Sequence, residues 1–181
     1  EHARMLRRDN AALDAYESLA KTFANEQTIL DLAESGITEL SLKRASAAEK
    51  GGRYSRARDL YLRLLKNRWN IAIAHRRFVR VSAKLDDIFA TQIYYQKRLE
   101  QDEGDAFAHY GLGLTWTYAK SPSLNLAEKH IRSALRINPK MAEAHLSMGW
   151  LRLQREHIEP NKNWLEKADN SFAIAEQLIQ K

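Results

Sequence analysis

Apolar residues recur at intervals of three and four along almost the whole chain, and this spacing places them on one face of an α-helix. The first such segment covers residues 8–23 and includes Leu13 and Tyr16, so it predicts a helix. A second helix is expected over residues 26–34, with Gly36 placed to end it. Only 7 glycines and 3 prolines interrupt the 181 residues. The sequence therefore predicts an all-α fold.

A longer period of about 34 residues lies over the helical one. First helices are expected to begin near Thr38, Ala72, Ala106 and Ala142, and a second helix follows each of them. A single pair of this kind cannot bury its apolar face, so each pair depends on its neighbour. We predict a helical cap or degenerate repeat over residues 1–37, followed by one continuous domain of about four helix pairs over residues 38–71, 72–105, 106–141 and 142–181.

The third helix pair carries the most regular motif. Its markers are a leucine-glycine pair, an aromatic residue, a small residue that opens the second apolar stripe and a closing proline, namely Leu112, Gly113, Trp116, Ala127 and Pro139. The leucine-glycine pair has a counterpart, methionine-glycine, in the fourth helix pair. The pattern resembles the tetratricopeptide repeat family. That resemblance implies a right-handed superhelix of antiparallel helix pairs, an α-solenoid, whose general task is to hold other molecules.

Close packing of helices explains the residue types in the motif. Glycine and alanine let two helix backbones approach, while large apolar side chains fill the space between neighbouring pairs. The residues expected to pack the repeats in this way are Leu112, Gly113, Trp116, Ala127, Met148, Gly149, Ala168 and Phe172. A bulky side chain at Gly113 is expected to destabilise the fold through overpacking.

The same resemblance predicts a binding surface, because the first helices of tetratricopeptide proteins line a concave groove where ligands generally lie. The positions that the resemblance places in this groove are Arg76, Arg80, Lys84, Phe107, Tyr110, Leu114 and Trp150. The three basic residues are four residues apart, so they share one helical face whatever the family. A solvated basic face, with no ligand, is the alternative interpretation of these three residues.

The positive charge of the chain is local. The formal net charge is +6, and residues 61–100 carry nine Lys and Arg against three Asp and Glu, which accounts for the whole excess. A basic groove with aromatic residues beside it favours a protein or peptide partner with an acidic or extended segment. We therefore expect a protein-interaction scaffold.

Three alternatives stay open. Trp150 and the segment 168–179 could bury against a second copy of the chain, which would make a homo-oligomer. The chain could also be a regulatory module of a larger signalling or enzyme protein, since it begins at Glu1 without a methionine and is expected to be processed or part of a longer protein. RNA binding is the third alternative, because four tryptophans could stack on bases beside the basic stretch. The balanced charge on both sides of that stretch argues against a long phosphate track, so nucleic acid is disfavoured as a partner.

No residue pattern indicates catalysis or a cofactor, so we expect neither. His75, His109 and His145 occupy one slot of three consecutive repeats, but equivalent side chains in neighbouring repeats stand too far apart to share a metal ion. We interpret these histidines as packing residues. The chain has no cysteine and no apolar run long enough to span a membrane. The cytoplasm is slightly favoured as its compartment.

Overall fold

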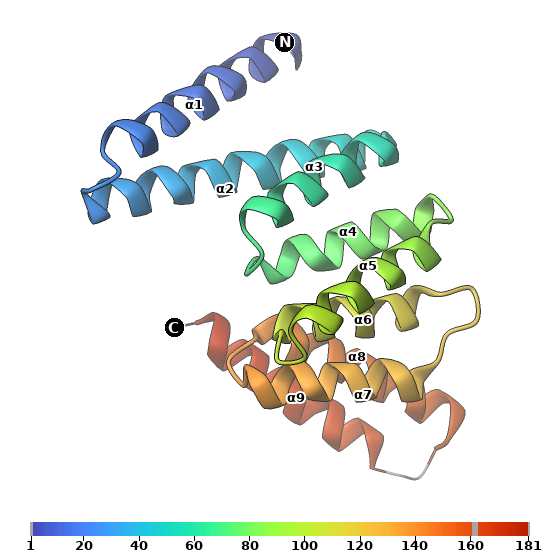
Figure 1. Ribbon diagram of the computed structural model, residues 1–181. Coiled ribbons are helices and arrows are strands. Elements are labelled where there is room, and N and C mark those ends of the chain that lie inside the picture. The colour runs from blue at the N-terminus through green and yellow to red at the C-terminus, as the bar shows by residue number, and fades with distance from the viewer. Residues whose placement is uncertain (1, 161–162, 181) are drawn as a thin grey trace. The chain divides into compact units, whose positions relative to one another are not determined.

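A computed structural model describes residues 2–160 and 163–180. The regular elements in these residues are all α-helices, which confirms the predicted fold class (Figure 1). In chain order they are α1 (His2–Thr22), α2 (Gln27–Lys50), α3 (Tyr54–Asn67), α4 (Ala72–Lys84), α5 (Ile88–Gln101), α6 (Ala106–Tyr118), α7 (Leu124–Ile137), α8 (Ala142–Ile158) and α9 (Trp164–Ile179). None of the helices in the described ranges is both long enough and apolar enough to cross a membrane.

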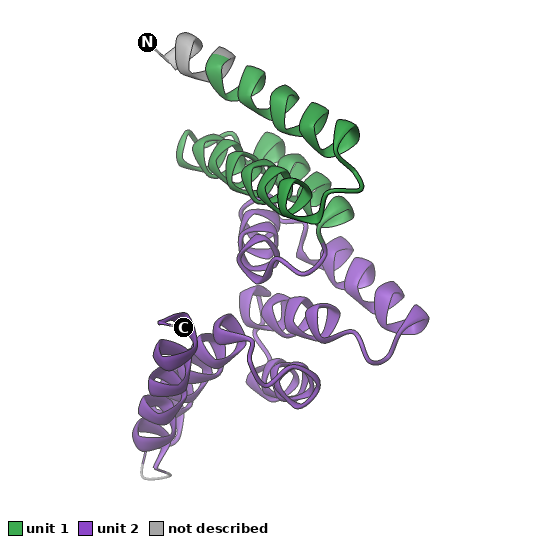
Figure 2. Ribbon diagram, turned by 90° about the vertical axis from the view of Figure 1, so that its left-hand side faces the viewer, with its two compact units in different colours: residues 1–68 green, residues 69–181 purple. Residues whose placement is uncertain are grey.

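The helices form two compact units, which Figure 2 shows in different colours. Unit 1 comprises residues 1–68 and contains α1, α2 and α3, whereas unit 2 comprises residues 69–181 and contains α4 to α9. Each unit has its own buried core. The predicted grouping of residues 38–181 into four repeats of one continuous domain, and the right-handed superhelix, stay predictions.

Gly36 in unit 1 does not end a helix, so that prediction is wrong. Helix α2 runs without interruption from Gln27 to Lys50. A Cβ atom built on Gly36 would lie 2.5 Å from Cζ of Tyr16, far inside van der Waals contact. The missing side chain therefore lets α1 and α2 pack closely, and the backbone of Gly36 keeps its helical course. Helix α1 also begins earlier than predicted, at His2.

Unit 2 consists of helices that pack in consecutive pairs. Helices α4, α6 and α8 begin at Ala72, Ala106 and Ala142, where the sequence predicts first helices. Helix α6 packs against α4, α5 and α7, while α8 packs against α7 and α9. Because each helix contacts its sequence neighbour across a short turn, the predicted antiparallel helix pairs are confirmed in this unit.

Two glycines show how closely the pairs in unit 2 approach. A Cβ atom at Gly113 would lie 2.7 Å from Cγ1 of Ile131 and 3.1 Å from the carbonyl oxygen of Ala127. At Gly149 it would lie 2.5 Å from Cε1 of Phe172. The other residues predicted to pack the repeats are all removed from solvent at least in part. Those that are buried are Leu112, Ala127, Met148 and Ala168, and those that are half-buried are Trp116 and Phe172.

Candidate functional site

A pocket of about 320 Å³ opens between three helices of unit 2, and each of the three begins at a position predicted for a first helix. Helix α4 contributes one residue to its lining, α6 contributes three and α8 contributes four. The lining residues are Arg76, Leu114, Thr117, Tyr118, Ser147, Trp150, Leu151 and Gln154. Three of the residues that the sequence places in a groove, Arg76, Leu114 and Trp150, thus gather in one pocket.

Arg76 provides the positive charge of this pocket. Its side chain is half-buried on α4, and among the residues that the structure describes no hydrogen bond or ion pair engages its guanidinium. Burial raises the pKa of Tyr110, a hydrogen bond with Ser147 and the nearby charge of Arg76 oppose this rise, and the carboxylate of Glu143 adds to it. The guanidinium of Arg76 therefore lies close to the core beneath the pocket and is available to a ligand.

Two aromatic side chains remain accessible at the pocket. Trp150 is 61% exposed, although its ring packs edge-to-face on Phe172 with centroids 5.7 Å apart. Tyr118, at the end of α6, is 38% exposed. Single exposed apolar side chains are common on folded proteins, whereas exposed apolar residues that gather around one pocket are typical of binding sites. One face of the Trp150 indole is thus supported by the core and the rest of it is open to a ligand.

The polar lining of the pocket was not predicted from the sequence, although a signal for it exists. Ser147, Trp150, Leu151 and Gln154 are spaced by three, one and three residues, which is the spacing of one helical stripe. Starting from Trp150, this stripe identifies the rest of the α8 lining. Thr117 belongs in the same way to the turn of α6 that carries Leu114.

Four residues predicted for the groove do not line this pocket. Tyr110 is fully buried, with its hydroxyl 3.4 Å from Oγ of Ser147, so it belongs to the core. The ring of Phe107 stacks on His75, with centroids 5.6 Å apart. Arg80 is half-buried and has interactions of its own, and Lys84 is exposed at the last position of α4. The predicted basic face therefore contributes one cation, Arg76, to the pocket.

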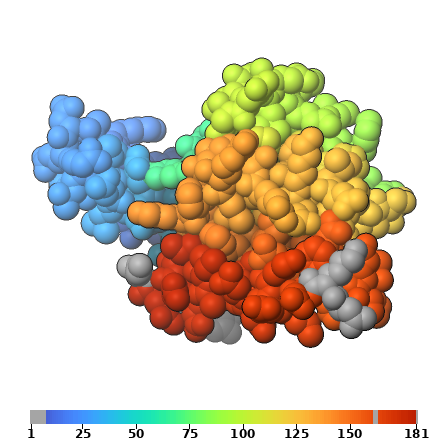
Figure 3. Space-filling view, turned by 90° about the horizontal axis from the view of Figure 1, so that it is seen from below, coloured from blue at the N-terminus to red at the C-terminus, as the bar shows by residue number. Residues whose placement is uncertain are grey.

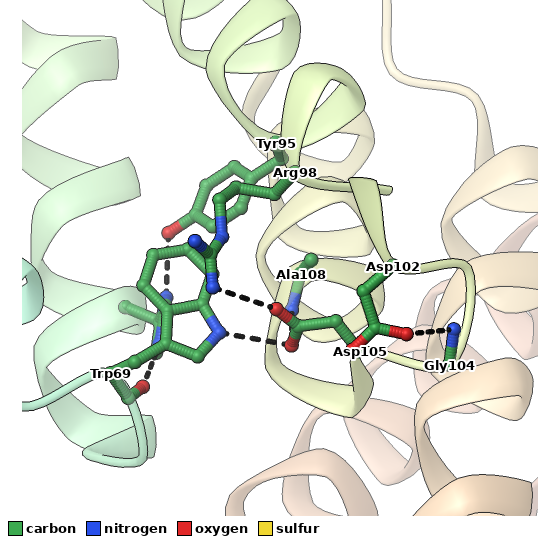
Figure 4. Close-up of polar contacts among 8 residues, drawn as sticks. Trp69, Tyr95, Arg98, Asp102, Gly104, Asp105 and Ala108 are labelled. Carbon is green, nitrogen blue, oxygen red and sulfur yellow. Dashed lines mark hydrogen bonds and ion pairs between the residues drawn. The ribbon is translucent and has the colours of Figure 1, made fainter. Parts of the chain in front are cut away.

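A polar network fixes the turn that leads into α6 (Figure 4). Asp105 is almost fully buried; its Oδ1 accepts hydrogen bonds from Nε1 of Trp69 and from the backbone N–H of Ala108, both at 2.9 Å. Its Oδ2 lies 3.4 Å from an Nη atom of Arg98, whose guanidinium stacks 4.4 Å above the Trp69 ring. These contacts engage both oxygens of Asp105, so the three side chains join α5 to the turns before α4 and α6; among the described residues, the buried Nε of Arg98 has no hydrogen-bond partner.

His75 completes this network from α4. Its Nε2 donates to the carbonyl oxygen of Trp69 at 2.6 Å, because a carbonyl can only accept. Its Nδ1 then accepts from the hydroxyl of Tyr95 at 2.8 Å. The ring is fully buried, and burial lowers the pKa of His75 to about 4. His75 is therefore a neutral core residue at physiological pH.

The three histidines at equivalent repeat positions make one recurring contact. In each case Nε2 donates to the backbone carbonyl six residues earlier, in the turn that precedes the helix. The distances are 2.6 Å from His75 to Trp69, 3.2 Å from His109 to Glu103 and 2.8 Å from His145 to Pro139. Within the described part of the chain, no three or more His, Asp or Glu side chains are grouped to hold a metal ion.

No protein-family model matches the sequence, and no curated protein matches it. Solved structures with a similar fold include a MamA RS-1 ArsTM double mutant, which is 20% identical, with 98% of this chain and 90% of that chain covered and a TM-score of 0.48. Residues 41 to the end of MamA from Desulfovibrio magneticus RS-1 are 17% identical, with 93% and 96% covered and a TM-score of 0.48. YrrB, described as a TPR protein with an unusual peptide-binding site, is 18% identical, with 98% and 87% covered and a TM-score of 0.44. At these identities and TM-scores the comparisons assign neither a family nor a ligand to this chain.

Proposed function

We propose that unit 2 is a protein-interaction module and that the pocket between α4, α6 and α8 binds an extended, acidic segment of a partner protein. The observation that carries the proposal is the position of the Arg76 guanidinium, which none of the described residues engages, beside two accessible aromatic rings in one pocket. This combination suits a peptide that presents a carboxylate next to a large apolar side chain.

The charge of the pocket favours an acidic ligand. A guanidinium binds a carboxylate through two parallel hydrogen bonds, which are stronger than bonds between neutral groups. Tyr110, whose hydroxyl lies 3.4 Å from Oγ of the lining residue Ser147, has a raised pKa and is neutral at physiological pH. Among the lining residues Arg76 is the one that carries a charge, so a carboxylate in the pocket would meet a positive charge, with the carboxylate of Glu143 as the opposing charge near Tyr110.

The remaining lining fits the other parts of an extended peptide. Trp150 and Tyr118 offer apolar area for a large side chain, and such aromatic residues commonly contribute most of the binding energy of an interface. An extended segment also presents unpaired backbone N–H and C=O groups at every residue. Thr117, Ser147 and Gln154 supply hydroxyl and amide groups that can satisfy them.

The outward face of α9 gives less support to self-association. Its exposed large apolar residues are Leu165 and Ile179, one at each end of the helix. The exposed positions between and beside them are otherwise mostly polar, namely Glu166, Lys167, Asp169, Asn170, Glu176, Gln177 and Gln180. A second copy that packed on this side of α9 would therefore meet a mostly polar face.

A random twelve-residue peptide library displayed on phage tests the proposal. Selection on the whole chain is expected to enrich peptides that carry Asp or Glu within three residues of a large apolar residue. The dissociation constant of an enriched peptide, labelled with a fluorophore, is then measured by anisotropy. Arg76→Glu is expected to weaken binding by at least about thirty-fold, because it replaces an attractive charge pair by a repulsive one.

Lys84→Glu is the matched control, since it makes the same charge change on the same helix at an exposed position outside the pocket. We expect it to weaken binding by less than about three-fold, through screened long-range electrostatics alone. Equal losses in the two variants would show that only the net charge matters and would contradict the proposed pocket. Selected peptides without any acidic preference would contradict the proposed ligand.

A further inference from the structure

A second pocket, of about 270 Å³, lies between α7, α8 and α9, which pack together in the region that Figure 3 shows from orange to red. It is lined by Arg132, Leu135, His145, Met148, Arg152, Asn170, Ser171 and Ile174. Helix α8 contributes different residues to the two pockets: Met148 and Arg152 lie about a third of a helical turn from the stripe of Ser147 and Leu151. The second pocket is therefore separate from the proposed peptide site.

Arg152 crosses from α8 to α9 at the edge of this pocket. One of its Nη atoms donates to the carbonyl oxygen of Lys167 and to Oγ of Ser171, each at 2.6 Å. Its Nε is buried and has no hydrogen-bond partner within residues 2–160 and 163–180. Because Ser171 accepts from Arg152, the hydroxyl proton of Ser171 remains free to donate to another group.

The charges around Arg152 do not balance. Burial lowers the pKa of Arg152, the carboxylate of Glu128 raises it and the neighbouring Arg132 lowers it. Glu128 is shared, because Arg132 binds its Oε1 through Nε at 3.0 Å and through an Nη atom at 2.5 Å, and Nε of Arg155 lies 3.0 Å from its Oε2. Arg155 lines a different pocket beside Glu159. Of the arginines next to Glu128, the two that line this pocket are Arg132 and Arg152, so one carboxylate is set against two guanidiniums and one positive charge is in excess.

We propose that this second pocket binds a dianionic phosphoryl group, carried either by free phosphate or by a phosphorylated side chain. A phosphate monoester has a charge of about −1.5 to −2 at neutral pH and three terminal oxygens that accept hydrogen bonds. That charge offsets the excess at Glu128. Arg132, the Ser171 hydroxyl and the Asn170 amide provide donors from two helices around the pocket, and charge-assisted bonds from arginine to phosphate are among the stronger ones in proteins.

Calorimetry of the whole chain tests this proposal with inorganic phosphate, with N-acetyl-O-phosphoserine amide and with the unphosphorylated serine amide. The wild-type chain is expected to bind one equivalent of at least one of the two phosphoryl compounds and not the serine amide. Tighter binding of free phosphate would identify the small ion as the source, and tighter binding of the phosphoserine compound would identify a modified side chain. Both results support the site.

Two variants with a matched control locate the binding. Arg132→Gln removes a largely exposed guanidinium of the pocket, and Arg152→Gln removes the one that crosses to α9. Each is expected to weaken phosphoryl binding by at least about ten-fold, whereas Arg136→Gln, an exposed arginine on α7 outside the pocket, is expected to leave it unchanged. Arg152 also links α8 to α9, so the Arg152 variant could fail to fold. In that case the Arg132 variant alone tests the site. The proposal would be overturned if neither phosphoryl compound showed saturable binding at concentrations up to about 10 mM, which is above the dissociation constant of even a weak specific complex. Equal affinities of the Arg132 and Arg136 variants would overturn it as well.

Discussion

Acidification should destabilise unit 2 through His75, and the size of this effect follows from its buried position. The imidazole is fully buried, and its pKa is lowered to about 4. In the unfolded chain the same group has a pKa of about 6.5. Between these values the unfolded chain binds a proton that the folded chain does not, so the free energy of unfolding falls as the pH falls from about 6.5 to about 4.

The magnitude is worked from the two pKa values. At pH 5 the unfolded His75 is almost fully protonated and the folded one is mostly neutral. One pKa unit corresponds to about 1.4 kcal/mol, so this residue alone lowers the free energy of unfolding by about 2 kcal/mol between pH 8 and pH 5. The loss approaches about 3 kcal/mol below pH 4 and is absent above pH 7.

The comparison of wild-type protein with His75→Gln isolates this contribution. Glutamine keeps a donor for the Trp69 carbonyl but does not titrate, and burial lowers the pKa values of His109 and His130 equally in both proteins. Urea unfolding followed by circular dichroism at pH 8 and pH 5 should show a pH-dependent loss about 2 kcal/mol smaller in the variant. An NMR titration that gave the folded His75 a pKa near 6.5 would refute the reasoning.

Three further predictions concern packing and polar contacts. Gly113→Ala should lower the free energy of unfolding by about 1 to 3 kcal/mol, measured by urea unfolding, because its Cβ would clash with Ile131; an unchanged midpoint would show that the helices can separate at no cost. Asp105→Asn should cost about 1 to 3 kcal/mol in the same assay, since a buried charge-assisted network loses its carboxylate, and stability equal to wild type would mean that the network is not required. Lys120→Ala should change stability by less than about 0.5 kcal/mol in thermal unfolding, because its ion pair with Asp86 is exposed; a loss above 1 kcal/mol would contradict this.

The sequence predicted the role of one closely packed glycine correctly and the role of another wrongly. The glycine at 113 follows a leucine inside a repeated motif, so its role in close helix packing could be predicted. Gly36 has no such repeat, and its position after an apolar helix favoured a helix end. The structure shows a close contact with Tyr16 instead. What decides between the two roles is the residue that lies opposite, 20 positions away in the chain.

The candidate site was predicted in part for a similar reason. The repeat period brings the first helices into register, so Arg76, Leu114 and Trp150 could be placed together before their side chains were seen. Helical spacing alone could not separate Arg76 from Arg80 and Lys84, because residues four apart share a face without reaching the same depth or height. Which of them enters a pocket depends on the neighbouring helix.

The network around Asp105 lay beyond the sequence pattern. Trp69, Arg98 and Asp105 come from a turn, a helix and a second turn, and a pattern that places residues on one helical face does not predict contacts between side chains of three such elements. The histidine positions, by contrast, recur with the repeat. Their common role could therefore be inferred, although its chemistry, a hydrogen bond to the preceding turn, required the structure.

A charge-swap experiment tests the central claim, that Arg76 recognises an acidic residue of a bound peptide. A peptide selected on the wild-type chain is compared with a version in which its acidic residue is replaced by lysine, each against wild type and Arg76→Glu, with affinities measured by anisotropy. We predict that the variant loses the acidic peptide and gains the lysine peptide, with a coupling of at least about ten-fold between the two changes. The claim would be contradicted if the losses of affinity from the two changes simply added and the lysine peptide bound the Arg76→Glu variant no better than it bound wild type.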